Sequence, residues 1–187
     1  DSAGYAGGIV GNLQGNRNST IEDCHNSGKI SMLDSTQCGI GGLVGISEAN
    51  LTIEASSNTG TISSAQSVNS LKLGGLVGST SGVLTLTQSY NAGSVNIPSS
   101  TGYAGGLIGQ AARPTSHQVE NCYNVGSVTG GTAGGLIGSL YANSSGGRTV
   151  SISCSYNAGT VNNGTGSTIV GQTSSYVTLT VADNCTY

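Results

Sequence analysis

The phrases Gly74–Gly78 (GGLVG) and Asn91–Val95 (NAGSV) decide the fold, because each recurs along the chain. The first phrase, Gly-Gly-(Leu/Ile)-(Val/Ile)-Gly, begins at Gly7, Gly41, Gly74, Gly105 and Gly134, with a degenerate copy at 167–171. The second phrase, Asn-x-Gly-x-(Val/Ile), begins at Asn26, Asn58, Asn91, Asn124 and Asn157, at spacings of 32, 33, 33 and 33 residues. A fixed period of this length indicates stacked structural repeats.

Between the two phrases apolar and polar residues alternate, as at 84–87, 150–153 and 177–181. Alternation with period two predicts a strand with one buried face. We therefore expect an all-β chain folded as a parallel β-solenoid of about six coils, with roughly 33 residues and about three short strands in each. A single domain, 1–187, would contain coils at approximately 4–30, 38–62, 71–96, 102–129, 131–162 and 164–187. The alternative, a six-bladed propeller, needs four strands per blade.

The second phrase places an asparagine at the same corner of every coil. Asn tolerates the left-handed backbone region, and its amide can bond its own turn or an equivalent amide one coil away. We therefore expect a structural ladder of Asn26, Asn58, Asn91, Asn124 and Asn157. The paired glycines of the first phrase are expected where a side chain would collide with the next coil.

Two consecutive apolar residues follow each glycine pair: Leu43-Val44, Leu76-Val77, Leu107-Ile108 and Leu136-Ile137. Neighbouring residues of a strand point to opposite faces of the sheet. One of these two columns is therefore expected to point out of the coil interior. It would be covered by another part of the chain or by another molecule.

The phrase Gly-Gly-Leu-(Val/Ile)-Gly, with Asn-x-Gly after it, resembles the GLUG motif repeats. The matching segments are 41–45, 74–78, 105–109 and 134–138, with a variant at 7–11. The resemblance covers essentially the whole chain, although the sixth copy departs from the pattern. It implies a module of large secreted or surface-attached proteins, including bacterial adhesins and the non-catalytic parts of some immunoglobulin-cleaving metallopeptidases. It implies no catalytic residue, because the repeat carries none.

Composition narrows the classes of partner. The 187 residues include 32 Gly, no Phe or Trp, five Lys or Arg and eight Asp or Glu, for a net charge of −3. Nucleic-acid binding would need clustered Lys and Arg, so we expect no nucleic-acid partner. No apolar run is long enough for a membrane span. The low charge permits close packing against other chains.

An enzyme would need a cluster of reactive side chains, and the chain offers few. The acidic residues are scattered over different coils, and no nucleophile elbow, His-Glu-x-x-His segment or phosphate-binding loop is present. We interpret His25 and His117 as surface or turn residues. The sequence therefore predicts no catalytic, cofactor-binding or metal-binding residue, no cofactor and no enzyme activity.

Five cysteines occur without a Cys-x-x-Cys pair, which disfavours zinc. Cys122 and Cys154 lie near the asparagine corner of adjacent coils and are candidates for a disulfide, as are Cys24 and Cys38. Cys185 would be unpaired or would bond another molecule. Buried thiols are the alternative. Disulfides would indicate an oxidising compartment.

Asn-x-Ser/Thr sequons occur outside the corner positions, mostly in the variable stretches. They predict possible N-glycosylation at Asn18, Asn50, Asn143, Asn163 and Asn184.

Tyrosines precede the corner asparagine at Tyr90, Tyr123 and Tyr156, where the first two coils carry His25 and Ser57. They are expected to form a stacked column. The first interpretation is a ladder that packs the turn, and the second is an exposed strip on which glycans stack. Tyr5 and Tyr103 precede their glycine pairs and are interpreted as structural.

These observations predict a structural module located outside the cell or on its surface. Neither end shows a polar cap, which favours head-to-tail self-association into a filament or stalk, or an origin within a longer repeat array. The alternative is an adhesin module that binds glycans or a host protein through a Tyr/Asn face. A minor alternative is ice binding by the outward residues Thr85, Thr87, Thr178 and Thr180.

Overall fold

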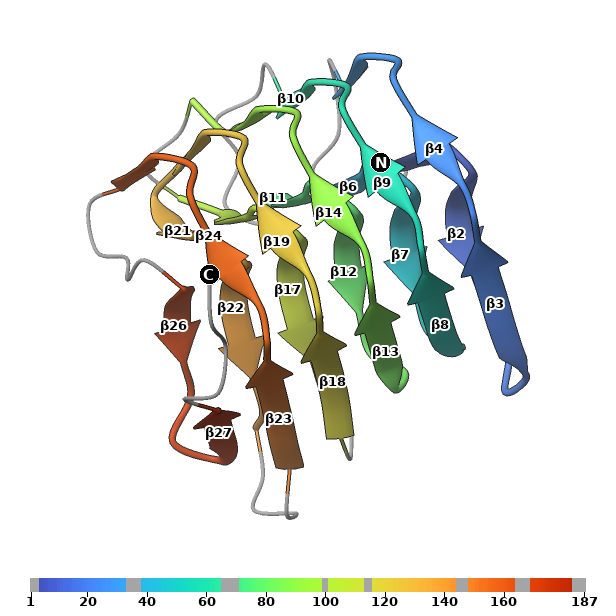
Figure 1. Cartoon of the computed structure of the whole chain (residues 1–187), viewed down its shortest axis with the longest axis vertical. Coiled ribbons are helices and arrows are strands. Elements are labelled where there is room, and N and C mark those ends of the chain that lie inside the picture. Colours follow the sequence, from blue (N-terminus) through green and yellow to red (C-terminus); the bar gives the residue numbers. More distant parts are fainter. Residues whose placement is uncertain are drawn as a thin grey trace.

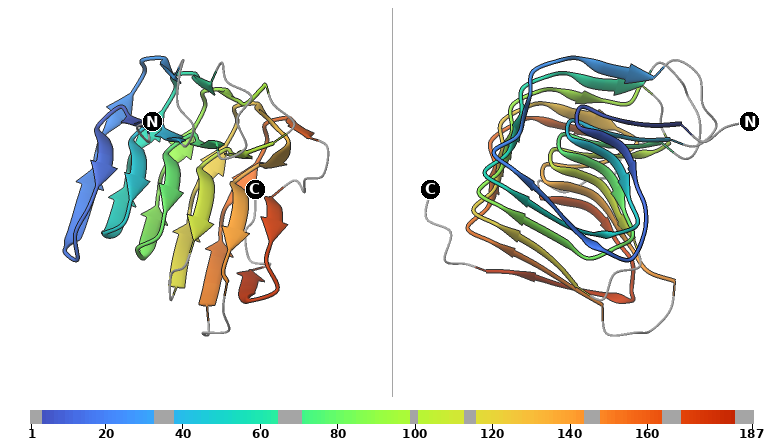
Figure 2. Two further views of the ribbon diagram at one scale, coloured as in Figure 1. Left: turned by 180° about the vertical axis from the view of Figure 1, so that it is seen from behind. Right: turned by 90° about the vertical axis from the view of Figure 1, so that its right-hand side faces the viewer.

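The computed structural model describes residues 4–32, 38–64, 71–98, 101–112, 116–143, 148–163 and 169–182. These residues form 27 β-strands and no helix. The coils lie side by side from β3 at one end to β27 at the other (Figure 1), and they superimpose when viewed along the stack (Figure 2). The predicted parallel β-solenoid is thus confirmed, with five full coils and two strands of a sixth.

Equivalent strands of successive coils form five parallel sheets, named A to E in their order along each coil. Sheet A contains β1 (Gly4–Gly7), β6 (Cys38–Gly41), β11 (Leu71–Gly74), β16 (Tyr103–Gly105) and β21 (Thr132–Gly134). Sheet B contains β2 (Val10–Leu13), β7 (Val44–Ser47), β12 (Val77–Thr80), β17 (Ile108–Ala112), β22 (Ile137–Tyr141) and β26 (Val170–Thr173). Sheet C contains β3 (Asn18–Glu22), β8 (Asn50–Glu54), β13 (Leu84–Thr87), β18 (Ser116–Glu120), β23 (Arg148–Ser153) and β27 (Val177–Val181). Sheet D contains β4 (His25–Asn26), β9 (Ser57–Asn58), β14 (Tyr90–Asn91), β19 (Tyr123–Asn124) and β24 (Tyr156–Asn157). Sheet E contains β5 (Ile30–Met32), β10 (Ile62–Ser64), β15 (Val95–Asn96), β20 (Val128–Gly130) and β25 (Val161–Asn163).

Each full coil therefore has five short strands, whereas the sequence pattern predicts three. The glycine phrase splits into two strands, because the chain bends after the second glycine and separates sheet A from sheet B. The asparagine phrase splits in the same way, because the turn at Asn-x-Gly separates sheet D from sheet E.

The bend in the glycine phrase also corrects the expectation for the paired apolar residues. Leu43 and Val44 are both fully buried, in the same hydrophobic cluster. Their backbone N–H groups both donate to Leu76 O, each at 3.0 Å, and the same double donation recurs in the other coils. Two successive N–H groups that point the same way break the alternation of a regular strand. Both columns therefore face inward, and no second layer is needed to cover either one.

The interior contains two separate hydrophobic clusters. The larger lies between sheets B and C and includes Leu76, Val77 and Leu86, and the smaller lies between sheets A and E and includes Leu73 and Val95. Aliphatic side chains stack in rows along the solenoid, which explains how a chain without Phe or Trp fills its core.

A left-handed residue forms the corner between sheets C and D in every full coil. The five residues with positive φ are Asp23, Ala55, Gln88, Asn121 and Cys154, with values between 46° and 53°. Only Asp and Asn among these types adopt this conformation readily. The corner is therefore imposed by the stacking of the coils and not by the residue that occupies it.

Candidate functional site

The asparagine corners form a continuous hydrogen-bonded column inside the solenoid. Each Nδ2 donates to the Oδ1 of the next coil, at 2.7 Å from Asn26 to Asn58 and at 2.8 Å for the three following steps. Each Nδ2 also donates to the carbonyl oxygen of the glycine two residues later, and Oδ1 accepts from the N–H of that glycine in four of the five coils. Asn58, Asn91 and Asn124 are fully buried. The side chains therefore satisfy their own polar groups within the interior.

The second glycine of each pair lies directly against this column. A Cβ on Gly42 would lie 2.5 Å from Asn58 Cγ, and a Cβ on Gly75 would lie 2.7 Å from Asn91 Cβ. The glycine pair and the asparagine thus form a narrow waist between the two hydrophobic clusters. Real Cβ atoms do not approach other atoms this closely, so only glycine fits.

A second interior column consists of hydroxyl and thiol groups, and the sequence interpretation missed it. Its members lie two residues before each corner asparagine and are Cys24, Ser56, Ser89, Cys122 and Ser155. Each side chain donates to the carbonyl oxygen two residues earlier, as Ser89 Oγ does to Thr87 O at 2.7 Å. The three serine hydroxyls also accept a backbone N–H from the preceding coil, as Ser89 Oγ does from Ser56 N at 3.0 Å. The recurrence of Ser or Cys two residues before each corner asparagine is the sequence signal that could have revealed this column.

Neither predicted disulfide is seen in the structure, where Cys24 and Cys122 are free thiols; the side chain of Cys38 lies outside the description. The expected Cys122–Cys154 pair fails because the two residues occupy different positions of the coil. Cys122 points inward and its N–H donates to Ser155 Oγ at 3.0 Å, whereas Cys154 occupies the left-handed corner. Burial raises the pKa of the Cys122 thiol to about 12. Cys185 lies outside the described residues.

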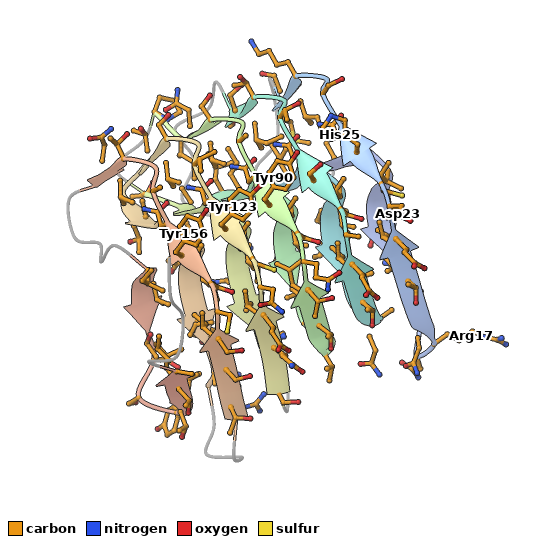
Figure 3. All side chains as sticks on the ribbon, viewed as in Figure 1. Arg17, Asp23, His25, Tyr90, Tyr123 and Tyr156 are labelled. Carbon is orange, nitrogen blue, oxygen red and sulfur yellow. The ribbon has the colours of Figure 1, made fainter. Side chains whose placement is uncertain are left out.

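The three tyrosines of sheet D form a stacked column on the surface (Figure 3). The ring centroids of Tyr90 and Tyr123 are 4.9 Å apart with an interplanar angle of 2°, and those of Tyr123 and Tyr156 are 5.3 Å apart at 10°. All three side chains are half-buried. Burial raises the pKa of Tyr123, and the neighbouring phenols of Tyr90 and Tyr156 raise it further.

The stacking limits what the tyrosine column can bind. Both faces of the Tyr123 ring are covered by its neighbours, so a sugar cannot lie on either face. At the next position of the column, His25 Nδ1 and Ser57 Oγ are 2.7 Å apart. Ser57 is buried, and among the described residues no carboxylate forms a hydrogen bond with His25. This pair therefore completes the column and does not resemble a triad.

The outer face of sheet C carries polar side chains in register. Its central column contains Thr20, Thr52, Thr85, Gln118, Ser151 and Thr180 in register. The sequence interpretation named Thr85 and Thr180 of this column but not Thr20 and Thr52. Thr87, by contrast, lies between Glu54 and Glu120, so the threonine array does not extend across the sheet.

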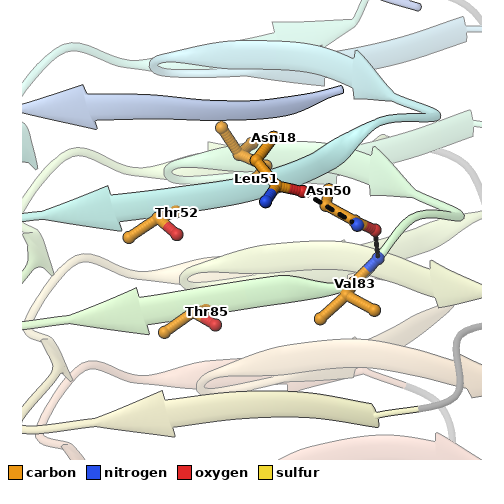
Figure 4. Close-up of a pocket in the computed structure, with 6 residues that line it drawn as sticks. All are labelled: Asn18, Asn50, Leu51, Thr52, Val83 and Thr85. Carbon is orange, nitrogen blue, oxygen red and sulfur yellow. Dashed lines mark hydrogen bonds between the residues drawn. The ribbon is translucent and has the colours of Figure 1, made fainter. Parts of the chain in front are cut away.

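A hollow of about 260 Å³ lies at one edge of this face (Figure 4). It is lined by Asn18, Asn50, Leu51, Thr52, Val83 and Thr85. Asn50 Nδ2 donates to Asn18 Oδ1, and Asn50 Oδ1 accepts from Val83 N, both at 3.1 Å. The hollow thus combines amide and hydroxyl groups with aliphatic carbon and has no charged lining residue.

Three of the predicted glycosylation sites have described side chains. Asn18 and Asn50 begin β3 and β8 and are exposed, and Asn143 is exposed after β22. The side chain of Asn163 and all of Asn184 lie outside the description. N-glycosylation at these positions stays a prediction.

His117 is not the surface or turn residue that the sequence suggested. It replaces an aliphatic residue on the inner face of sheet C, between Leu84 and Val150, and is 2% exposed. Leu84 N donates to Nδ1 at 3.1 Å, which assigns the ring proton to Nε2, and Nε2 is buried without a partner. Burial lowers the pKa of His117 to about 3.

The described ranges contain no group of three His, Cys, Asp or Glu side chains that could hold a metal ion. They also contain no helix of the length and apolarity that a bilayer crossing requires.

The fold and its interior columns define the class: a β-solenoid repeat protein, in which each full coil is one copy of a motif of four glycines and an asparagine. The family described as the GLUG motif matches residues 2–31, the first of these copies. The later coils repeat that copy in register, so the match supports a GLUG-repeat protein. No curated protein and no solved structure matches it.

Proposed function

We propose that this chain is a non-catalytic structural module that acts outside the cell as a rigid rod and stacks head to tail on further coils of the same kind. The observation that carries the proposal is the exposure of the core columns at both ends of the stack. Ile9 is 48% exposed whereas its equivalent Leu43 is fully buried, and Val181 is 50% exposed whereas Ile152, beside it in register, is 1% exposed. Another coil placed on either end would bury these residues and pair the open strand edges.

A parallel solenoid makes such stacking directional. Sheet B ends in β2 on one side and β26 on the other, and sheet C ends in β3 and β27, and within each sheet all strands are parallel. The β26–β27 edge of one copy therefore fits the β2–β3 edge of the next as a further parallel coil. Such a heterologous contact propagates into a filament.

Electron microscopy of the purified chain tests this proposal, with Ile9→Lys and Val181→Lys as variants that place a charge in the contact. Filaments of the native chain that are lost in both variants are the expected result. Val125→Lys is the matched control, because Val125 is 46% exposed on the side of an inner coil. Isolated rods at all concentrations would reject stacking between copies. Surface labelling of intact source cells tests the location outside the cell.

The second candidate is an adhesin module, and the hollow on sheet C favours it over the tyrosine column. Neutral amide and hydroxyl groups beside aliphatic carbon suit a neutral sugar, which presents hydroxyl groups and C–H faces. A glycan array should detect a ligand that Thr85→Lys abolishes. Thr180→Lys, in the same column but outside the hollow, should retain it. If the array detects no ligand, the adhesin candidate is rejected and the structural module is the remaining function.

A further inference from the structure

The geometry of the tyrosine column places equivalent ring atoms of adjacent coils opposite one another. The rings of Tyr90 and Tyr123 are parallel within 2°, and they repeat from coil to coil in register. Each carbon ortho to the Tyr90 hydroxyl is therefore about one centroid separation, 4.9 Å, from its counterpart on Tyr123. The same holds at 5.3 Å for Tyr123 and Tyr156. The side chains are half-buried, so an oxidant in solution can reach their edges.

The other described tyrosines lack such neighbours in their own columns. Tyr103 pairs with Lys72 on one side and Thr132 on the other, and Tyr5 pairs with Gly39. Tyr141 pairs with Ala112, and Tyr176 lies outside the strands, in the turn before β27. A reaction that joins two phenols within one molecule is therefore favoured at the sheet D column.

We propose that Tyr90, Tyr123 and Tyr156 form an oxidative cross-linking site, at which a peroxidase with hydrogen peroxide joins Tyr123 to Tyr90 or Tyr156 as dityrosine. Each phenol loses one electron and one proton to give a phenoxyl radical. The two radicals form one bond between ortho carbons, and each ring proton then moves to oxygen and restores the phenol. Hydrogen peroxide takes up the two electrons and two protons and becomes two waters.

This bond would connect adjacent coils covalently. It would do so in a solenoid whose thiols Cys24 and Cys122 are not joined in disulfides. A covalent link between residues 33 positions apart removes conformations from the unfolded chain, as a disulfide does. Cross-linking therefore lets an oxidising environment stabilise the rod without cysteine pairing. The reaction depends on the ring geometry and not on stacking between copies.

The experiment treats the full chain, at low and high protein concentration, with horseradish peroxidase and hydrogen peroxide. Dityrosine fluorescence reports the reaction, and mass spectrometry locates it after digestion with trypsin and a glutamyl endopeptidase. Cleavage after Lys72, Glu120 and Arg148 places Tyr90, Tyr123 and Tyr156 on three different peptides. We expect the two pairs that contain Tyr123, in monomeric chains and with a yield independent of protein concentration.

Tyr123→Phe is the decisive variant, because phenylalanine retains the stacked ring and removes the phenol. Tyr90 and Tyr156 then lie two coils apart, so both cross-linked peptide pairs should disappear. Tyr103→Phe is the matched control and should leave both pairs unchanged. Cross-links that persist in Tyr123→Phe, that form only between chains, or that use Tyr103 as often as Tyr123 would overturn the proposal.

Discussion

Asn91 Nδ2 donates a hydrogen bond of 2.8 Å to Asn124 Oδ1, and both side chains are fully buried in the waist between the two hydrophobic clusters. Asn91 also accepts from Asn58 Nδ2 and exchanges two bonds with Gly93. One side chain thus makes four hydrogen bonds that connect three coils. The waist is polar inside, and its stability depends on the completeness of this column.

Replacement of Asn91 by alanine should lower the free energy of unfolding by about 3 to 4 kcal/mol, because it leaves several buried polar groups without partners. Urea denaturation followed by circular dichroism measures the change. Asn26→Ala is the control: Asn26 lies in the first coil and is only half-buried, so water can replace its bonds. Equal losses at both positions would contradict the importance of burial.

Gly75→Ala should prevent normal folding or lower stability by more than about 3 kcal/mol, because the added methyl group collides with Asn91 and with the backbone of the next coil. Gly28→Ala should be tolerated, since the nearest atom to its Cβ would be Asn26 Oδ1 at 3.5 Å. Far-ultraviolet circular dichroism and thermal unfolding compare the two. A stable, native-like Gly75→Ala variant would show that the waist can widen.

The repeat period predicts the solenoid and its register because every coil must bury the same faces against its neighbours. The positions of Asn58, Asn91 and Asn124 in the sequence therefore correspond directly to one column in space. Stacked tyrosines follow from the same reasoning.

The direction of individual side chains within a coil could not be predicted as well from the repeat pattern. Strict alternation placed Leu43 and Val44 on opposite faces, but the bend at the glycine pair turns both inward. A one-residue offset separates Cys122 from the position of Cys154, and this offset decides whether a side chain faces the core or the corner. The alternation within Ser116–Glu120 places His117 on the same face as Val119, and in the structure that face is buried. The interpretation of His117 as a surface or turn residue did not use this alternation.

The buried imidazole of His117 should make stability fall in acid. Its pKa is about 3 in the folded chain against an ordinary value of 6.5, so the folded state favours the neutral ring. The stability associated with this preference is complete above pH 6.5 and is lost as the pH falls from 6.5 towards 3, at up to about 1.4 kcal/mol per pH unit. Urea unfolding across this range measures it.

His117→Leu is the matched variant, because leucine occupies the equivalent positions Leu51 and Leu84. The variant should retain only the acid dependence that the carboxylates cause, and the difference between the two profiles isolates the histidine. Parallel profiles would mean that His117 does not titrate between the folded and unfolded states.

Ala55→Gly should raise the free energy of unfolding by about 0.5 to 1 kcal/mol. Ala55 is exposed and has a φ of 48°, where a Cβ atom is strained and glycine is not. The relief exceeds the extra entropy that glycine gains in the unfolded chain. Asn121→Gly, at the same corner with a φ of 53°, should bring little or no gain, because Asn already tolerates this conformation. Urea midpoints of both variants measure the difference, and a loss of stability in Ala55→Gly would show that the stacked corner does not strain its residue.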